Sequence, residues 1–346
     1  MKIAQIAPVW FPVPPSGYGG IELIVSILAD GLVDLGHDVT LFAAKGSSTT
    51  GNLVTPLSEV PDPRDLGNVW FDTMHCLRTY LEILEGDYDI VHDHSGIIGP
   101  AIGVMAAKAS RRFVLAHTLH GPWTPQGGAY YQSIDNLVEL IAISHTQMSD
   151  NPHVSYSGMV YNGIDIGSYR FEGRKEEFLV YIGRANPDKG PVHAIKLAKA
   201  TGHSLKMVLK RNEPNERDYF ESEIAPILDD SIEVVQNISH DAKVDLLSRA
   251  KAMIFPIAWP EPFGLVMAEA MACGTPVIAG KWGAAQELVL PGETGYLCLD
   301  DSDYIEALKK VTTIDPARCR AWVEEKFSSE VMVAGYEALF ARLLGR

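Results

Sequence analysis

The chain is poor in cysteine and in positive charge, and both shortages narrow its range of functions. Its 346 residues include four cysteines, at 76, 273, 298 and 319, without the close pairing of zinc sites or redox couples. Lysine and arginine number 29 against 44 acidic residues, a formal net charge of −15. General attraction to nucleic acid or anionic lipid is therefore not expected, and a bound polyanion needs a local group of cations.

Long apolar runs are also missing. The run from Met1 to Pro8 is too short for a signal peptide, and no later segment reaches a membrane-spanning length without charge. We therefore expect a cytoplasmic protein without stable membrane insertion. The content of 47% hydrophobic and 21% charged residues is typical of a soluble globular protein, and the length predicts two domains.

Two common motifs are absent. The glycine-rich segment near the start does not match the dinucleotide fingerprint, because Glu22 stands where a third glycine is required after Gly17 and Gly19. The strand predicted next does not end in an acid, so a nicotinamide cofactor is disfavoured. No serine lies in a Gly-x-Ser-x-Gly pattern, and a hydrolase nucleophile elbow has no support.

Apolar runs suited to buried parallel strands alternate with helical patterns in both halves of the chain. The clearest helix is predicted over residues 21–35, with Gly36 placed to end it. Strands are predicted in the first half at 3–7, 39–42, 90–91, 113–116 and 140–143. In the second half they are predicted at 178–182, 205–209, 232–235, 252–255 and 276–278.

This alternation predicts two α/β domains, each a doubly wound, Rossmann-like parallel sheet. The turn-rich segment 161–165 and the charged run 172–177 are typical of a linker, so we place the hinge near Asn162 and Gly163. The tail from Arg318 to Arg346 is predicted to be helical and amphipathic. Ligands of such sheets bind at the carboxyl ends of the strands.

The most informative segment follows a predicted strand of the second half. A short helix is predicted from Gly264 to Cys273, and the backbone N–H groups at its start favour an anion such as a diphosphate at Phe263, Gly264 and Leu265. Glu261 and Glu269 frame this position. Two separated carboxylates suit recognition of sugar and ribose hydroxyls, although favourable helix electrostatics and solvated side chains are the simpler explanation of such a pair.

A second loop concentrates positive charge in an otherwise acidic chain. Gly183 and Arg184 end a predicted strand, and Lys189 precedes the next helix, where a cation is unfavourable without a ligand. Arginine can contact two phosphate oxygens at once, and lysine adds a compact charge. The loop therefore predicts a diphosphate site. Lys210, after the following strand, is a weaker candidate because it could simply be exposed.

Together these motifs resemble the donor site of retaining glycosyltransferases of the GT-B type, the large family 4 that includes sucrose and trehalose-type synthases. The resemblance covers almost the whole chain, but only the motifs of the second half are specific. It implies a GT-B fold, with two Rossmann-like domains facing across a cleft. Residues 1–163 would bind the acceptor, 164–325 the nucleotide-sugar donor, and 326–346 would form a helix crossing back to the first domain.

The resemblance also implies roles for individual residues. The Gly19–Gly20 turn would face the donor diphosphate, and His120 would lie beside the transferred sugar. The implied catalytic residues are His120, Glu261, Arg184 and Lys189. The implied donor-binding residues are Gly19, Gly20, Gly183, Arg184, Lys189, Lys210, Phe263, Gly264, Leu265 and Glu269. Tyr296 and Glu287 belong to further turns that shape the nucleotide pocket.

Histidines gather at the ends of two first-half strands. Strand alternation places His92 and His94 on one face, but a metal site would need a third ligand that the sequence does not identify. We expect Asp93 and His94 to line the acceptor site, with their individual roles open. His117 is expected to be a buried, hydrogen-bonded histidine.

The function implied is metal-independent transfer of a hexose, with retention, from a nucleoside diphosphate sugar to a hydroxyl of a small-molecule or saccharide acceptor. A uridine donor is favoured, and no cofactor is expected. Residues 14–20 and 92–95 are similar to a bacterial subgroup that includes antibiotic glycosyltransferases. The alternatives are a GT-B-fold nucleotide-sugar epimerase, a phosphorylase, or a non-catalytic sugar-nucleotide-binding protein. The acceptor and the oligomeric state stay open.

Overall fold

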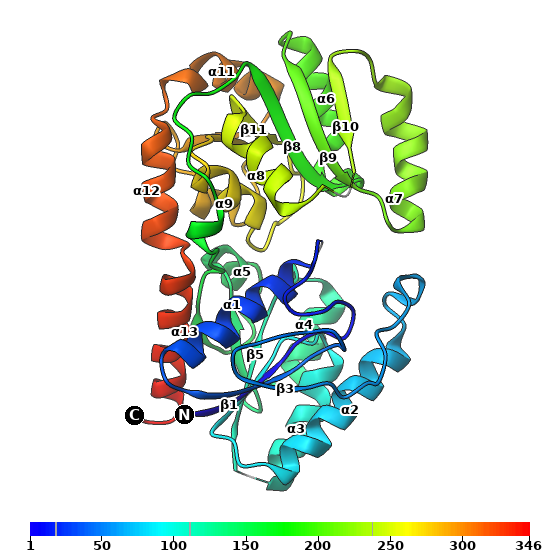
Figure 1. The fold of residues 1–346 in the computed structure, drawn as a ribbon, viewed down its shortest axis with the longest axis vertical. Coiled ribbons are helices and arrows are strands. Elements are labelled where there is room, and N and C mark those ends of the chain that lie inside the picture. The colour runs from blue at the N-terminus through cyan, green and yellow to red at the C-terminus, as the bar shows by residue number, and fades with distance from the viewer. Residues whose placement is uncertain (18, 111, 237) are drawn as a thin grey trace. The chain divides into compact units, whose positions relative to one another are not determined.

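The computed structural model describes residues 1–17, 19–110, 112–236 and 238–346, and the chain forms two compact units (Figure 1). The first unit comprises residues 1–163 together with 329–346, and the second comprises residues 164–328. The chain therefore passes from one unit to the other twice. Tyr18, in the glycine-rich segment discussed above, lies outside the described residues.

The first unit is built on a seven-stranded parallel sheet with the order β3-β2-β1-β4-β5-β6-β7. Its strands are β1 (Lys2–Ile6), β2 (Asp38–Phe42), β3 (Asn52–Val54), β4 (Ile90–Asp93), β5 (Val114–Thr118), β6 (Glu139–Ala142) and β7 (Tyr156–Met159). Its helices are α1 (Gly20–Asp34), α2 (Val69–Glu85), α3 (Ile98–Ser110), α4 (Pro125–Ser133), α5 (His145–Asp150) and α13 (Ser329–Leu343).

The second unit is built on a six-stranded parallel sheet with the order β10-β9-β8-β11-β12-β13. Its strands are β8 (Phe178–Arg184), β9 (Ser204–Lys210), β10 (Ile232–Val235), β11 (Ala252–Phe255), β12 (Val277–Gly280) and β13 (Gly295–Cys298). Its helices are α6 (Pro191–Ala200), α7 (Pro214–Tyr219), α8 (His240–Arg249), α9 (Leu265–Ala272), α10 (Ala285–Leu288), α11 (Asp301–Lys310) and α12 (Pro316–Lys326). The predicted α/β fold with two doubly wound sheets is confirmed.

Each sheet has a point where the strand order reverses. In the first unit β1 pairs with both β2 and β4, so the reversal lies between β1 and β4. In the second unit β8 pairs with both β9 and β11, and the reversal lies between β8 and β11. Loops that leave such neighbouring strands diverge and open a crevice at the carboxyl ends. These two positions are therefore where a ligand of each unit is expected.

Three strands, β3, β7 and β13, are not predicted by the sequence patterns. Each is the outermost strand of its sheet. An edge strand is short and half-covered, so it can lack the apolar run by which the central strands are predicted. The edge strand β10 keeps Ile232, Val234 and Val235 and is predicted. Tyr296, expected in a turn, lies in β13, and Glu287 lies in the short helix α10.

The helical tail is broken into two helices rather than continuous. Phe327 follows α12, and its ring packs edge-on against Phe263 and Trp322 at centroid distances of 5.7 and 5.8 Å. The helix α13 that follows belongs to the first unit, where the Tyr336 and Thr118 hydroxyls are 3.0 Å apart. The core of the first unit is therefore completed by the last residues of the chain.

Within the described ranges, no helix combines the length and apolar character needed to cross a membrane.

Candidate active site

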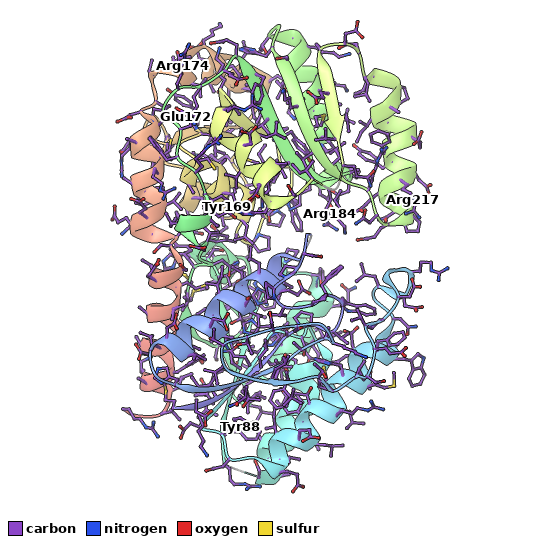
Figure 2. All side chains as sticks on the ribbon, viewed as in Figure 1. Tyr88, Tyr169, Glu172, Arg174, Arg184 and Arg217 are labelled. Atoms are coloured by element: carbon purple, nitrogen blue, oxygen red, sulfur yellow. The ribbon has the colours of Figure 1, made fainter. Side chains whose placement is uncertain are left out.

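Arg184 lies at the carboxyl end of β8, beside the reversal point of the second sheet (Figure 2). Its side chain is half-buried, and it has no hydrogen bond or ion pair with any residue that the structure describes. A half-buried guanidinium without a carboxylate partner is costly unless a ligand or solvent satisfies it. The adjacent Gly183 leaves no room for a side chain, because a Cβ there would lie 2.7 Å from the Tyr181 hydroxyl.

Lys189 and Glu261, predicted to bind different parts of the donor, are joined to each other. The Lys189 ammonium donates to Oε2 of Glu261, and the two side chains are only 13% and 10% exposed. The Trp259 indole N–H donates to the same oxygen at 2.8 Å, and the ammonium lies 4.3 Å from the centroid of that ring. Burial lowers the pKa of Lys189, and the charge of Glu261 opposes this shift.

The main chain around Glu261 is held rigidly. The N–H of Ala284 donates to the Glu261 carbonyl at 2.8 Å, and the N–H of Glu261 donates to the Trp259 carbonyl at 2.8 Å. Gly283 lies so close that a Cβ would be 2.3 Å from the backbone of Glu261, and its φ is +53°. Any other residue at position 283 would therefore displace the backbone of Glu261.

Helix α9 begins as the sequence predicts. Gly264 has φ = +91°, a conformation suited to glycine, and α9 starts at Leu265. The Phe263 side chain is buried in the core of the second unit. Glu269, in the helix, is 3% exposed; Tyr169 donates to its Oε1 at 3.0 Å, and Lys243 does so at 2.7 Å. Its Oε2 has no hydrogen-bond partner in the described part of the chain.

Lys210, the weaker candidate, has carboxylate partners of its own. Its ammonium lies 2.7 Å from Glu213 and 3.5 Å from Glu216. This pairing offsets much of its charge, which leaves Arg184 as the better anion ligand at the ends of β8 and β9.

In the first unit, a buried histidine network occupies the reversal point between β1 and β4. Nδ1 of His94 is 2.8 Å from Nε2 of His120, and Nε2 of His94 is 3.0 Å from Gln5 and 3.2 Å from Nδ1 of His92. The His92 ring continues to the Thr118 hydroxyl at 2.7 Å. The imidazoles of His92, in β4, and His94, directly after it, therefore share one face, as the strand alternation predicts.

The first-unit site residues divide between a cavity wall and the core behind it. A cavity of about 320 Å³ opens at the carboxyl ends of the strands. Its wall consists of Ile21, His94, Gly96, Ile97, His117, Thr118, Leu119, His120, Gly121, Pro122, Trp123, Thr124, Gly127 and Tyr131. Asp93 is absent from this wall, contrary to expectation. Its carboxylate is buried, accepts hydrogen bonds from Tyr80 and Ser95, and lies 3.5 Å from Nδ1 of the buried His117.

Burial keeps the histidines of the network uncharged. It lowers the pKa of His120 to about 3 and that of His94 well below its ordinary value, and neighbouring imidazoles add to both shifts. Both rings are therefore neutral near pH 7. A neutral imidazole has one N–H donor and one bare nitrogen acceptor, which suits hydroxyl groups rather than anions. Both ring nitrogens of His94 have partners inside the network, so the nitrogen that can meet a ligand is Nδ1 of His120, which has no partner among the described residues.

The Gly19–Gly20 turn begins helix α1, and a buried carboxylate lies against it. Glu22 is 5% exposed, and a Cβ at Gly19 would lie 3.0 Å from its Oε2. Burial raises the pKa of Glu22 from 4.5 to about 7, although its own backbone N–H partly offsets this shift. Between these pH values the folded protein keeps a proton that the unfolded chain releases, so stability decreases as the pH rises through this window.

We expect Glu22→Gln to raise the free energy of unfolding by up to about 3 kcal/mol above pH 8, because the amide avoids burying a charge. Below about pH 4 the two proteins should be almost equally stable, because both states of the wild type are then protonated. Urea unfolding over this pH range measures the difference. A gain that does not change with pH would contradict the argument.

Several contacts were not predicted, notably those of Trp259, Lys243, Tyr169 and Gln5. Trp259 could have been found, since it precedes Glu261 by two residues. The others lie far from their partners in sequence and carry no motif. Within the described ranges, no three or more His, Cys, Asp or Glu side chains are grouped to hold a metal ion. Metal-independent chemistry stays a prediction.

Two family models match consecutive parts of the chain. The model "Glycosyltransferase Family 4" matches residues 18–166, and "Glycosyl transferases group 1" matches residues 169–326. The phosphatidyl-myo-inositol mannosyltransferase of Mycolicibacterium smegmatis is 25% identical over 331 residues, covering 89% of this chain and 83% of that protein. The D-inositol 3-phosphate glycosyltransferase of Pseudarthrobacter chlorophenolicus is 25% identical over 372 residues, covering 89% and 87%.

Three solved structures share the fold over nearly all of both chains. Sucrose-phosphate synthase from Thermosynechococcus elongatus has a TM-score of 0.83 at 21% identity, covering 100% of this chain and 99% of that one. AviGT4, a glycosyltransferase involved in avilamycin A biosynthesis, has 0.74 at 24%, covering 100% and 98%. Anabaena HepE in complex with UDP and glucose has 0.75 at 19%, covering 99% of each. These likenesses establish the GT-B fold.

The two family models lie end to end along the chain, and the fold agrees with them. This chain therefore belongs to glycosyltransferase family 4, whose members transfer a sugar from a nucleotide-sugar donor.

Proposed function

We propose that this protein transfers a hexose, with retention of anomeric configuration, from a uridine diphosphate sugar to a hydroxyl group of a small-molecule or saccharide acceptor. The observation that carries the donor assignment is the arrangement of Arg184, Lys189 and Glu261 at the reversal point of the second sheet. Arg184 has no protein carboxylate among the described residues. The complex of Anabaena HepE with UDP and glucose supports uridine as the donor base.

In this proposal the second unit stabilises the leaving group. The bond from the anomeric carbon to the diphosphate breaks, and its electron pair leaves on the diphosphate oxygen. The guanidinium of Arg184 and the ammonium of Lys189 would stabilise that negative charge. Each well-placed donor contributes on the order of 3 kcal/mol to stabilisation of the transition state. A phosphate oxygen would replace Glu261 as the partner of Lys189, so that Glu261 becomes an acceptor for hydroxyl groups of the sugar.

Glu269 would bind the ribose. One oxygen of its carboxylate is held by Tyr169 and Lys243, while Oε2 lacks a partner in the described part of the chain. A ribose hydroxyl is a donor that would satisfy this oxygen without bringing a second negative charge. The N–H groups from Phe263 to Leu265, at the start of α9, would add donors to the diphosphate.

The first unit would bind the acceptor. The acceptor oxygen would form its bond to the anomeric carbon on the face that the diphosphate leaves, and its proton would pass to the departing diphosphate. The neutral ring of His120 would bind a hydroxyl of the transferred sugar, and Gly19 and Gly20 would allow a close backbone contact with the diphosphate.

The stereochemical proposal is tested by proton NMR of the product. With an α-linked uridine diphosphate hexose, we expect the new glycosidic bond to show the small H1–H2 coupling of an α-linkage in gluco- or galacto-configured sugars. A β-linked product would refute retention, and conversion of the donor sugar without an acceptor would favour an epimerase.

A further inference from the structure

We infer that the acceptor is an uncharged, hydroxyl-bearing molecule that presents about one ring to the first-unit cavity, and that phosphate- and carboxylate-bearing acceptors are rejected. This inference rests on the proposed function, because it assigns the cavity of the first unit to the acceptor. The volume of about 320 Å³ lies at the small end of ligand pockets. It suits one sugar or aromatic ring.

The first observation is the absence of cations from every segment that builds the cavity. Its wall contains neither lysine nor arginine among the described residues. The sequence extends this result beyond the wall, because there is no lysine or arginine in residues 3–44, 79–107 or 113–169. These segments include the loops that follow β1, β4, β5 and β6. An anionic group placed there would lack a counter-charge.

The histidines of the wall do not replace the missing cations. His94 and His120 are held neutral by burial. His117 has Asp93 at 3.5 Å, so any positive charge on its ring is already matched inside the protein. Glu22, in the first turn of α1 next to the wall residue Ile21, brings no positive charge either, and any charge it carries above its raised pKa of about 7 is negative. The described wall therefore offers an anion no unmatched positive charge.

The polar groups of the wall are matched to hydroxyls. Nε2 of His120 is used by His94, and its other ring nitrogen has no hydrogen bond within the part of the chain that the structure describes. Trp123, Leu119 and Tyr131 supply apolar and aromatic surface. One open imidazole nitrogen beside aromatic side chains is a common way to bind a sugar ring or a flat hydroxylated ring.

The second unit shows the contrasting arrangement. Arg184 and Lys189 lie at its reversal point, where a diphosphate is expected. Two relatives are named for acceptors that carry phosphate, phosphatidyl-myo-inositol and D-inositol 3-phosphate. An acceptor site without cations would separate this chain from those relatives, although all three share the overall family.

The test uses two pairs of probes that differ mainly in charge. One pair is phenyl β-D-glucopyranoside and its C6 carboxylate, phenyl β-D-glucuronide; the other is myo-inositol and myo-inositol 1-phosphate. Saturation-transfer NMR titrations on the full-length protein measure binding. We expect at least one neutral member to bind, and its anionic partner to bind at least about tenfold more weakly. Equal or tighter anion binding, or no binding of either neutral probe, would overturn the inference.

A charge added to the rim gives an independent readout. Ile97, a wall residue that is 59% exposed, can carry an arginine without burying it. Ile97→Arg should strengthen binding of the anionic probes about tenfold at low salt, and this gain should decrease as salt is added. Leu81→Arg, on an exposed position of α2, adds the same charge away from the wall and should give no gain. Equal effects of the two variants would refute a local cause.

Failure of the donor assignment remains distinguishable from failure of this inference. Calorimetric titration with UDP tests the donor site in the second unit without any acceptor. A protein that does not bind UDP but still prefers the neutral probes refutes the proposed donor site and keeps the charge selectivity. A protein that binds UDP but prefers the anionic probes refutes the charge selectivity and keeps the proposed donor site.

Discussion

Replacing Arg184 by alanine is expected to lower the turnover number at least about 100-fold, because one preorganised donor to the leaving diphosphate is lost. Stability should hardly change, since the guanidinium has no hydrogen bond or ion pair with any described residue. Arg184→Lys should recover part of the rate, because it restores the charge but not the two-point contact. Initial rates with a uridine diphosphate sugar, together with calorimetric titration of UDP, measure both effects.

The matched control for this variant is Arg174→Ala. Arg174 is an exposed arginine of the same unit that lies outside the proposed site (Figure 2). Its loss should leave the rate and the UDP affinity near the wild-type values. If Arg184→Ala bound UDP as tightly as wild type and turned over at the same rate, the diphosphate would have to lie elsewhere.

Removing one partner of the Lys189–Glu261 pair should destabilise the second unit strongly. Lys189→Met leaves the Glu261 carboxylate nearly buried with the Trp259 indole as its remaining side-chain donor, and such changes cost about 3 kcal/mol or more. The double variant Lys189→Met/Glu261→Gln should recover most of this loss, because no unpaired charge stays buried. Urea unfolding at neutral pH measures both, and either variant should abolish most of the turnover.

The control for the pair is Lys310→Met, which breaks an exposed ion pair with Glu306 in α11. Exposed pairs contribute little, so its unfolding curve should match that of the wild type. If Lys189→Met and the double variant lost the same stability, the cost would come from lost packing of the long lysine side chain. The buried charge would then not be its cause.

The parts of the site that can be predicted from the sequence are those formed by residues close together in the chain. Residues 183–190 and 261–269 each place glycine, proline and charged side chains at a strand end, so their local conformation is visible in the sequence. Strand alternation likewise put His92 and His94 on one face. Central strands were found because both of their faces are buried.

Contacts between distant residues were not predictable in this way. Lys189 and Glu261 are 72 positions apart, and nothing in either motif indicates that the two charges meet. The hydroxyls of Thr118 and Tyr336 meet across 218 positions. The edge strands β3, β7 and β13 also escaped, because their exposed sides remove the apolar run that identifies a strand.

The discontinuity of the first unit affects the order in which the protein is completed during synthesis. The second unit is one uninterrupted segment, and all of it has left the ribosome before α13 emerges. The first unit, although it is made first, still lacks Tyr336, which closes its histidine network. Since domains fold as units once their residues are available, the first unit cannot be completed before α13 has been made. A nascent chain stalled before residue 329 would therefore expose the apolar core of an incomplete first unit. Such exposed surface is what chaperones bind.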